Sequence, residues 1–122
     1  MFKRRTSKIL KQYPDGEIIK KSIPATYLGG EKRKFNLFRG TGLLILTKDN
    51  LYFEYIIPRK KIQIPIKAIN KVELTKWFSK RTKGKPVIKI SFINRKGKSV
   101  SKGWIVKESQ KWLDLIRKRI VN

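Results

Sequence analysis

The sequence GTGLLILTKDNLYFEY occupies residues 40–55, and KIQIPI follows at residues 61–66. An apolar run and an aromatic run are joined here by the polar residues 48–50, so the pattern predicts two antiparallel strands and a tight turn. Ile62, Ile64 and Ile66 then share one parity, which predicts a third strand with one buried face. These neighbouring strands favour a small antiparallel barrel.

The first of these strands is unusual because Leu43–Leu46 is continuously apolar. A strand with one face in water alternates between apolar and polar side chains, so we expect both faces of this strand to be covered. Gly40 and Gly42 precede the run and predict a bend or a bulge at a barrel corner.

The rest of the chain predicts four more strands and one helix. The strands are expected over residues 17–27, 69–77, 87–93 and 100–106, with residues 94–98 as a hairpin turn. Apolar residues then recur at intervals of three and four, which predicts an amphipathic helix over residues 107–121 with Trp112 in the core. The predicted fold class is mainly β (α+β): a seven-stranded antiparallel barrel capped by one C-terminal helix.

Composition limits the function. The 122 residues include 32 basic and 8 acidic side chains, a formal net charge of +24, with no Cys and no His. The missing residue types exclude disulfides, thiolate metal sites and ordinary transition-metal centres, and we expect no cofactor. The charge indicates an anionic partner. Residues 1–15 are expected to be a basic arm or short helix ahead of a domain at 16–122.

Targeting signals are not evident. No apolar run approaches the roughly 20 residues of a membrane span, and residues 1–13 have no apolar core of a secretory signal. We expect a cytoplasmic protein, either free or peripheral to a membrane.

The carboxylates indicate no catalytic site. None of the eight falls in a recognisable pair or metal-ligand spacing. Glu54 and Glu73 lie on predicted strands, where we expect them to pair with lysine. We interpret the chain as a non-enzyme.

The layout resembles the pleckstrin-homology (PH) superfold, in its GRAM-like and bacterial PH-like branch. The similarity rests on residues 16–19, residues 25–27, the pattern Gly40-x-Gly42-Leu43-x-Ile45-Leu46-Thr47-x-x-x-Leu51-x-Phe53, the isoleucines from 62 to 69, and Trp112-x-x-x-Ile116. It covers about residues 16–121. The resemblance implies a barrel whose open end is filled by the helix, and it implies a fold without implying a chemistry.

The resemblance also implies an anionic-headgroup site at three loops, those joining strands one to two, three to four and six to seven. The basic residues there are Lys32, Arg33, Lys34 and Arg39; then Arg59, Lys60 and Lys61; then Arg95, Lys96 and Lys98. Lys20 and Lys21 on the first strand are expected to add to the cluster. The apolar Leu43–Leu46 lacks the spaced basic residues of specific phosphoinositide binders, which favours a looser anionic attraction.

A second basic surface is predicted at residues 76–85. Its aromatic and basic side chains are Trp77, Phe78, Lys80, Arg81, Lys83 and Lys85. Aromatic rings beside cations stack on nucleic-acid bases or enter a lipid interface.

Three hypotheses follow. The preferred one is a PH-like module that binds anionic lipid headgroups or an acidic protein. The alternatives are a nucleic-acid-binding protein that uses the +24 charge with Trp77 and Phe78, and a structural protein-interaction domain whose charge is incidental.

Overall fold

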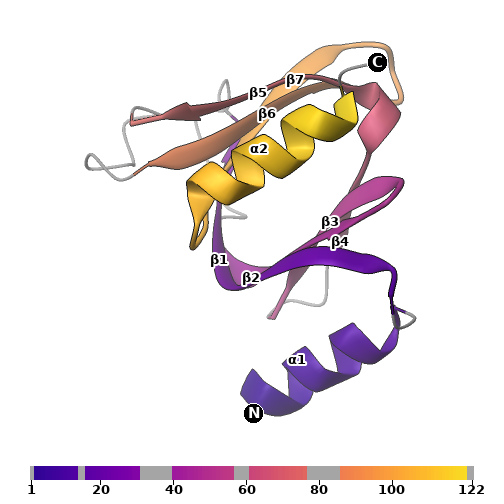
Figure 1. Cartoon of the computed structure of the whole chain (residues 1–122), viewed down its shortest axis with the longest axis vertical. Coiled ribbons are helices and arrows are strands. Elements are labelled where there is room, and N and C mark those ends of the chain that lie inside the picture. Colours follow the sequence, from indigo (N-terminus) through magenta and orange to yellow (C-terminus); the bar gives the residue numbers. More distant parts are fainter. Residues whose placement is uncertain (1, 14–15, 31–39, 57–60, 77–85, 121–122) are drawn as a thin grey trace.

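The computed structural model describes residues 2–13, 16–30, 40–56, 61–76 and 86–120 (Figure 1). In chain order the elements are α1 (Phe2–Lys11), β1 (Ile18–Gly30), β2 (Gly40–Thr47), β3 (Asn50–Tyr55), β4 (Lys61–Pro65), the 3₁₀ turn η1 (Ile66–Ala68), β5 (Ile69–Thr75), β6 (Val87–Ile93), β7 (Ser99–Ile105) and α2 (Ser109–Ile120). The prediction of seven antiparallel strands followed by a C-terminal helix is confirmed.

The seven strands form one open sheet in the order β4-β3-β2-β1-β7-β6-β5. The predicted barrel therefore does not close, because β4 and β5 stand at opposite ends of this order. The chain passes from β4 to β5 through η1, which turns it away from strand pairing. The 13-residue β1 pairs with β2 along most of its length and with β7 near its end. It therefore links the two halves of the sheet, β2–β4 on one side and β5–β7 on the other.

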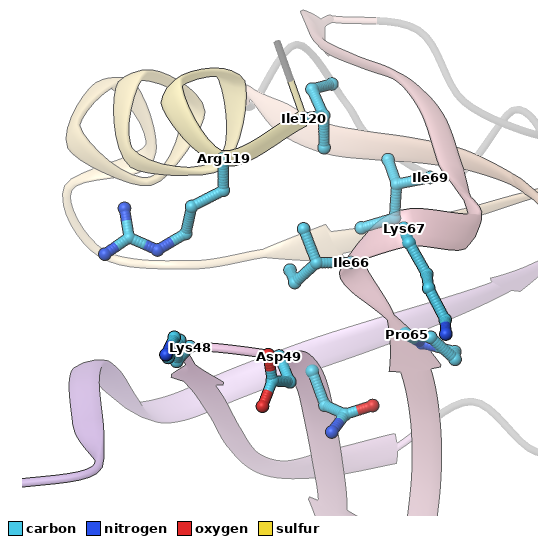
Figure 2. Close-up of a pocket in the computed structure, with 9 residues that line it drawn as sticks. Lys48, Asp49, Pro65, Ile66, Lys67, Ile69, Arg119 and Ile120 are labelled. Carbon is cyan, nitrogen blue, oxygen red and sulfur yellow. The ribbon is translucent and has the colours of Figure 1, made fainter. Parts of the chain in front are cut away.

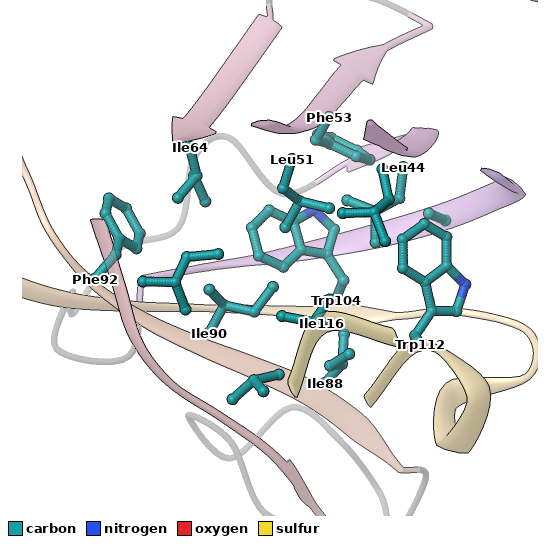
Figure 3. Packing of buried hydrophobic residues seen from close by; sticks show 14 of the residues in the cluster. Leu44, Leu51, Phe53, Ile64, Ile88, Ile90, Phe92, Trp104, Trp112 and Ile116 are labelled. Atoms are coloured by element: carbon teal, nitrogen blue, oxygen red, sulfur yellow. The ribbon is translucent and has the colours of Figure 1, made fainter. Parts of the chain in front are cut away.

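The larger core cluster lies between the two halves of the sheet (Figure 3). Leu44, Phe53 and Ile64 reach it from β2–β4, and Ile88, Ile90 and Phe92 reach it from β6. On α2, Trp112, Leu113 and Ile116 are buried against the same cluster, which confirms Trp112 as a core residue. In Figure 1, α2 runs alongside β5 and β6 on the side that faces β1–β4, where the apolar side chains of an open sheet need a cover.

Both faces of β2 are covered, as its apolar run predicts. Leu44 and Leu46 belong to the larger core, whereas Leu43 and Ile45 pack with Ile9 of α1 in a second cluster. Figure 1 shows α1 on the far side of β1–β4 from α2. The N-terminal segment therefore supplies the outer cover of the strand that opens the sequence.

Gly42 lies where two strands approach closely. A Cβ atom at this position would lie 2.1 Å from the backbone oxygen of Glu54 on β3. The pairing of β1 with β2 also shifts register beside it, between Ser22 and Ala25, so the expected irregularity is present, on the partner strand β1. Glycine is required here by space and not by a positive φ.

Candidate functional site

The connections expected to hold the basic site leave one edge of the sheet. In an antiparallel order of β4-β3-β2-β1-β7-β6-β5, strands β1, β3 and β6 run in the same direction. The segments that follow them therefore begin at the same edge, here called the loop edge. Lys32, Arg33, Lys34, Arg39, Arg59 and Lys60 lie outside the described residues, whereas Lys61, Arg95, Lys96 and Lys98 lie within them at this edge.

The β6–β7 turn holds three exposed cations. The Asn94 side-chain oxygen accepts hydrogen bonds from the backbone N–H groups of Lys96 at 2.9 Å and Lys98 at 3.0 Å. Gly97 adopts a φ of +78°, which suits a residue without a Cβ atom. With the backbone polar groups satisfied inside the turn, the side chains of Arg95, Lys96 and Lys98 project into solvent.

A fifth described cation at this edge, Lys102 of β7, was missed by sequence reasoning. Its ammonium donates a hydrogen bond to the Tyr27 hydroxyl at 2.9 Å and lies 5.4 Å from the centre of that ring. Lys102 shares the parity of Val100 and the fully buried Trp104, so the alternation along β7 already places it on the inner face. Its backbone partner is Gly30, the last residue of β1.

Tyr27 joins Lys102 to a group of aromatic rings on the inner face. Tyr27 packs on Tyr55 with ring centres 6.0 Å apart, and burial together with the nearby Tyr27 raises the pKa of Tyr55 to about 12. The Tyr55 phenol therefore stays neutral at physiological pH. Lys102 is the charged group of this cluster, at the edge where the β1–β2 connection begins.

Lys61 lies on the outer face of the sheet instead. Its ammonium is 5.2 Å from the centre of the Tyr52 ring, and the Tyr52 ring packs edge-on against Tyr13 at 5.2 Å. The loop edge thus carries described cations on its inner face, its outer face and its exposed turn.

Lys20 and Lys21 lie far from the loop edge, near the start of β1. Lys20 pairs with Leu46 across the sheet, and Gly30 follows ten residues later, about 30 Å along an extended strand. The Lys20 ammonium forms an ion pair of 3.0 Å with Glu108 and lies 5.9 Å from the Trp112 ring. Lys21 is exposed. The structure does not bring this pair together with the turn cations.

Glu108, just before α2, gathers two of the chain's cations. It accepts hydrogen bonds from Lys111 and Lys20, which lower the pKa of its carboxyl to about 2, and its backbone has a φ of 56°. Its backbone oxygen also accepts the first helical hydrogen bond, from the N–H of Trp112 at 3.1 Å. This carboxylate is engaged in fixing α2 to β1.

The two strand carboxylates have different partners. Glu73 lies 3.6 Å from Lys71 and 3.7 Å from Lys89, which confirms the expected lysine pairing. Glu54 has no lysine partner among the described residues, and its buried carboxylate instead accepts a 2.6 Å hydrogen bond from the Tyr13 hydroxyl. Burial, followed by the hydrogen bond to Glu54, raises the pKa of Tyr13 well above its usual value. Within the described ranges, acidic side chains do not gather in groups of three that suit a metal ion.

The second predicted surface cannot be placed in the same way, since Trp77, Phe78, Lys80, Arg81, Lys83 and Lys85 lie outside the described residues. The flanking strand ends, Thr75 of β5 and Val87 of β6, pair with each other. They lie at the edge of the sheet opposite the β6–β7 turn, because that turn follows the other end of β6. The two predicted basic surfaces therefore begin at opposite edges.

A groove of about 570 Å³ opens beside η1 (Figure 2). It is bounded by the β2–β3 turn, by η1 with the flanking ends of β4 and β5, and by the last turn of α2. The lining residues are Lys48, Asp49, Asn50, Pro65, Ile66, Lys67, Ile69, Arg119 and Ile120. No local sequence pattern predicts this groove, since its walls come from parts of the chain up to 72 residues apart (48 to 120).

Comparisons with known proteins identify a fold and no family. No protein-family model and no curated protein sequence matches the chain. Among solved structures, the C-terminal domain of an unknown protein from Leishmania infantum is similar, with a TM-score of 0.60 and 14% sequence identity over 94% of this chain and 97% of that one. At this identity the likeness concerns the fold alone. Helices within the described residues are all too short or too polar to cross a bilayer.

Proposed function

We propose that the chain is a non-enzymatic, PH-like (GRAM-like) module that binds an anionic partner through its loop edge. The observation that carries this proposal is the β6–β7 turn, which presents Arg95, Lys96 and Lys98 to solvent at the edge where two further basic connections begin. The seven antiparallel strands followed by a C-terminal helix support a PH-like architecture. The engagement of Glu54, Glu73 and Glu108 in structural contacts supports a binding role over a catalytic one.

The partner that best suits this edge is an anionic membrane surface, with an acidic protein as the alternative source of the same charge. Each basic residue close to an anionic leaflet contributes about 1 kcal/mol, and this attraction fades within a Debye length. Several cations on one edge act together, so modest single contributions sum to peripheral binding. A cytoplasmic protein recruited to a membrane is the corresponding cellular picture.

The test is a titration of the whole chain against anionic liposomes and against single- and double-stranded DNA, at about 50 and 200 mM salt. We expect liposome binding that persists at the higher salt and weakens at least tenfold when Arg95, Lys96 and Lys98 are replaced by alanine. The matched control replaces Lys107, Arg117 and Lys118, which are exposed and carry the same total charge away from the loop edge.

Each other outcome contradicts the proposal in a distinct way. DNA binding that is tighter than liposome binding and steeply salt-dependent would favour the nucleic-acid alternative. Equal losses in the two triple variants would mean that only total charge matters. Loss of all binding at the higher salt would favour a protein-interaction domain with incidental charge.

A further inference from the structure

We propose that the groove beside η1 is a second anion site, which binds a phosphate monoester with an apolar body. This inference is independent of the proposed loop-edge function. The groove adjoins the β2–β3 turn, whereas the loop edge lies at the other ends of β2 and β3.

The first reason is the set of unpaired cations around the groove. The ion pairs of the described residues join Lys20 and Lys111 to Glu108, and Lys71 and Lys89 to Glu73. Lys48, Lys67 and Arg119 are not among them. Three like charges at one opening repel each other, and an anion bound among them would relieve that repulsion.

The second reason is the charge balance. Three cations and the single carboxylate of Asp49 give the lining a net charge of +2. A phosphate monoester carries a charge of about −1.5 to −2 at pH 7, so it matches this lining better than a monocarboxylate does. Arg119 also offers a planar fork of N–H donors, and the hydrogen bond from this side chain to the Leu115 carbonyl is long at 3.5 Å.

The third reason is the shape of the groove. A volume of about 570 Å³ is within the range of small-molecule sites and far exceeds a bare phosphate. Figure 2 shows Arg119 and Lys48 on one side of Ile66 and Lys67 on the other. Ile69 and Ile120 line the same opening, so the ligand has an apolar body beside its phosphate.

Such a ligand would connect parts of the fold that the sheet leaves apart. Arg119 belongs to α2, which packs on β5, β6 and η1, whereas Lys48 belongs to the turn between β2 and β3 in the other half of the sheet. A phosphate held by both would tie α2 across the open gap. Binding is therefore expected to raise the thermal midpoint in a saturable way, because the ligand binds the folded state alone.

The experiment uses octyl phosphate as the probe, with methyl phosphate and octanol as controls that keep only one half of its chemistry. We expect octyl phosphate to bind at least tenfold more tightly than either control, with saturable NMR shifts at the methyl groups of Ile66, Ile69 and Ile120. Equal binding of octyl and methyl phosphate, or an absence of saturation, would overturn the proposal.

Two double variants separate the groove from total charge. Lys48→Gln with Arg119→Gln should weaken octyl phosphate binding about tenfold or more, whereas Arg117→Gln with Lys118→Gln should leave it unchanged. Both pairs remove two charges from the +24, and both include residues from the end of α2. Equal weakening by the two pairs would overturn the site.

A substitution of the opposite sign completes the test. Asp49→Asn removes the one carboxylate of the lining and should tighten binding several-fold. Weaker binding in this variant would contradict an anion site, and its thermal midpoint without ligand reports separately whether it folds.

Vesicles distinguish the source of the phosphate. Octyl phosphate binding without recruitment to vesicles that contain phosphatidic acid would support a soluble ester. Recruitment that falls further in the Lys48/Arg119 pair than in the Arg117/Lys118 pair would support a lipid headgroup. The absence of both octyl phosphate binding and vesicle recruitment would overturn the proposal.

The Arg95/Lys96/Lys98 triple variant should leave octyl phosphate binding intact. A failure of the groove site and a failure of the loop edge are therefore distinguishable.

Discussion

The two faces of β2 are buried by different means. Its inner face, with Leu44 and Leu46, packs into the large core that both halves of the sheet and α2 share. Its outer face, with Leu43 and Ile45, is covered by the short helix α1 through Ile9 and partly buried neighbours. One apolar run thus contributes side chains to two clusters of unequal size. Substitutions on the two faces should therefore lower the free energy of unfolding by different amounts.

Gly42→Ala should have the largest effect, because it disrupts β2 itself. The added methyl group would meet the Glu54 backbone oxygen at 2.1 Å, and a strand backbone cannot withdraw from its pairing. We expect a loss of more than about 4 kcal/mol in the free energy of unfolding, or no folded protein. Urea unfolding followed by circular dichroism measures this.

Gly40→Ala is the matched control for that substitution. The nearest atoms to its new Cβ are ring carbons of Tyr55 at 3.1 Å, and a side chain can shift by a few tenths of an ångström. A Gly42→Ala protein that unfolds at the same urea concentration as the Gly40→Ala protein would contradict the close-approach argument.

Trp112→Ala tests the inner cluster. The side chain is fully buried between α2 and the sheet, so its removal leaves a large cavity. We expect a loss of about 3–5 kcal/mol in the free energy of unfolding. Trp112→Phe, which retains an aromatic ring, should recover part of that loss. Similar stabilities for the two variants would mean that the core collapses around the site.

Ile9→Ala tests the outer cluster and should cost less. Ile9 is fully buried, but its cluster is smaller, and alanine favours the helix slightly more than isoleucine does. We expect a loss of about 2–3 kcal/mol. A loss equal to that of Trp112→Ala would contradict the expected difference between the two faces of β2. It would mean that the outer cluster contributes as much to the free energy of unfolding as the larger core does.

Tyr13→Phe tests the polar contact at the margin of the outer cluster. It removes the 2.6 Å hydrogen bond to the buried carboxylate of Glu54, at an expected cost of about 1–2 kcal/mol. Adding Glu54→Gln should recover much of that loss, because a neutral amide is less costly to bury without its partner. If Tyr13→Phe instead leaves the stability unchanged, packing of the ring on Tyr52, which phenylalanine keeps, and not the hydrogen bond, is what Tyr13 contributes.

Local patterns in the sequence predicted the elements but not how they meet. The sequence pattern located β6, whose Ile88, Ile90 and Phe92 are buried, and the apolar run of β2 predicted that both of its faces are covered. The identity of the outer cover was not predictable, because α1 contributes few apolar residues among many lysines and arginines. Whether β4 and β5 pair is a long-range property of the whole sheet, so local patterns could predict the strands of a barrel but not that the sheet stays open.

The candidate sites follow the same rule. The β6–β7 turn was predictable because Asn94 and Gly97 are neighbours in sequence, and the inward position of Lys102 could have been found from the parity of Trp104. The ion pair between Lys20 and Glu108 could not have been predicted from local patterns, since the two residues are 88 positions apart. The groove likewise exists only after three distant segments fold together.

Glu108→Gln should give the smallest effect, and one that depends on pH. Hydrogen bonds from Lys111 and Lys20 lower the pKa of the Glu108 carboxyl from 4.5 to about 2. A carboxyl whose pKa falls on folding stabilises the protein above its unfolded pKa, and this contribution is lost as the pH falls through the folded value. Urea unfolding of the wild type should therefore lose stability between about pH 4.5 and 2 more steeply than unfolding of the variant. Because the carboxylate is exposed, 1 M salt should reduce the difference, and a difference that survives such screening would mean that Glu108 fixes α2 to β1 by geometry and not by charge.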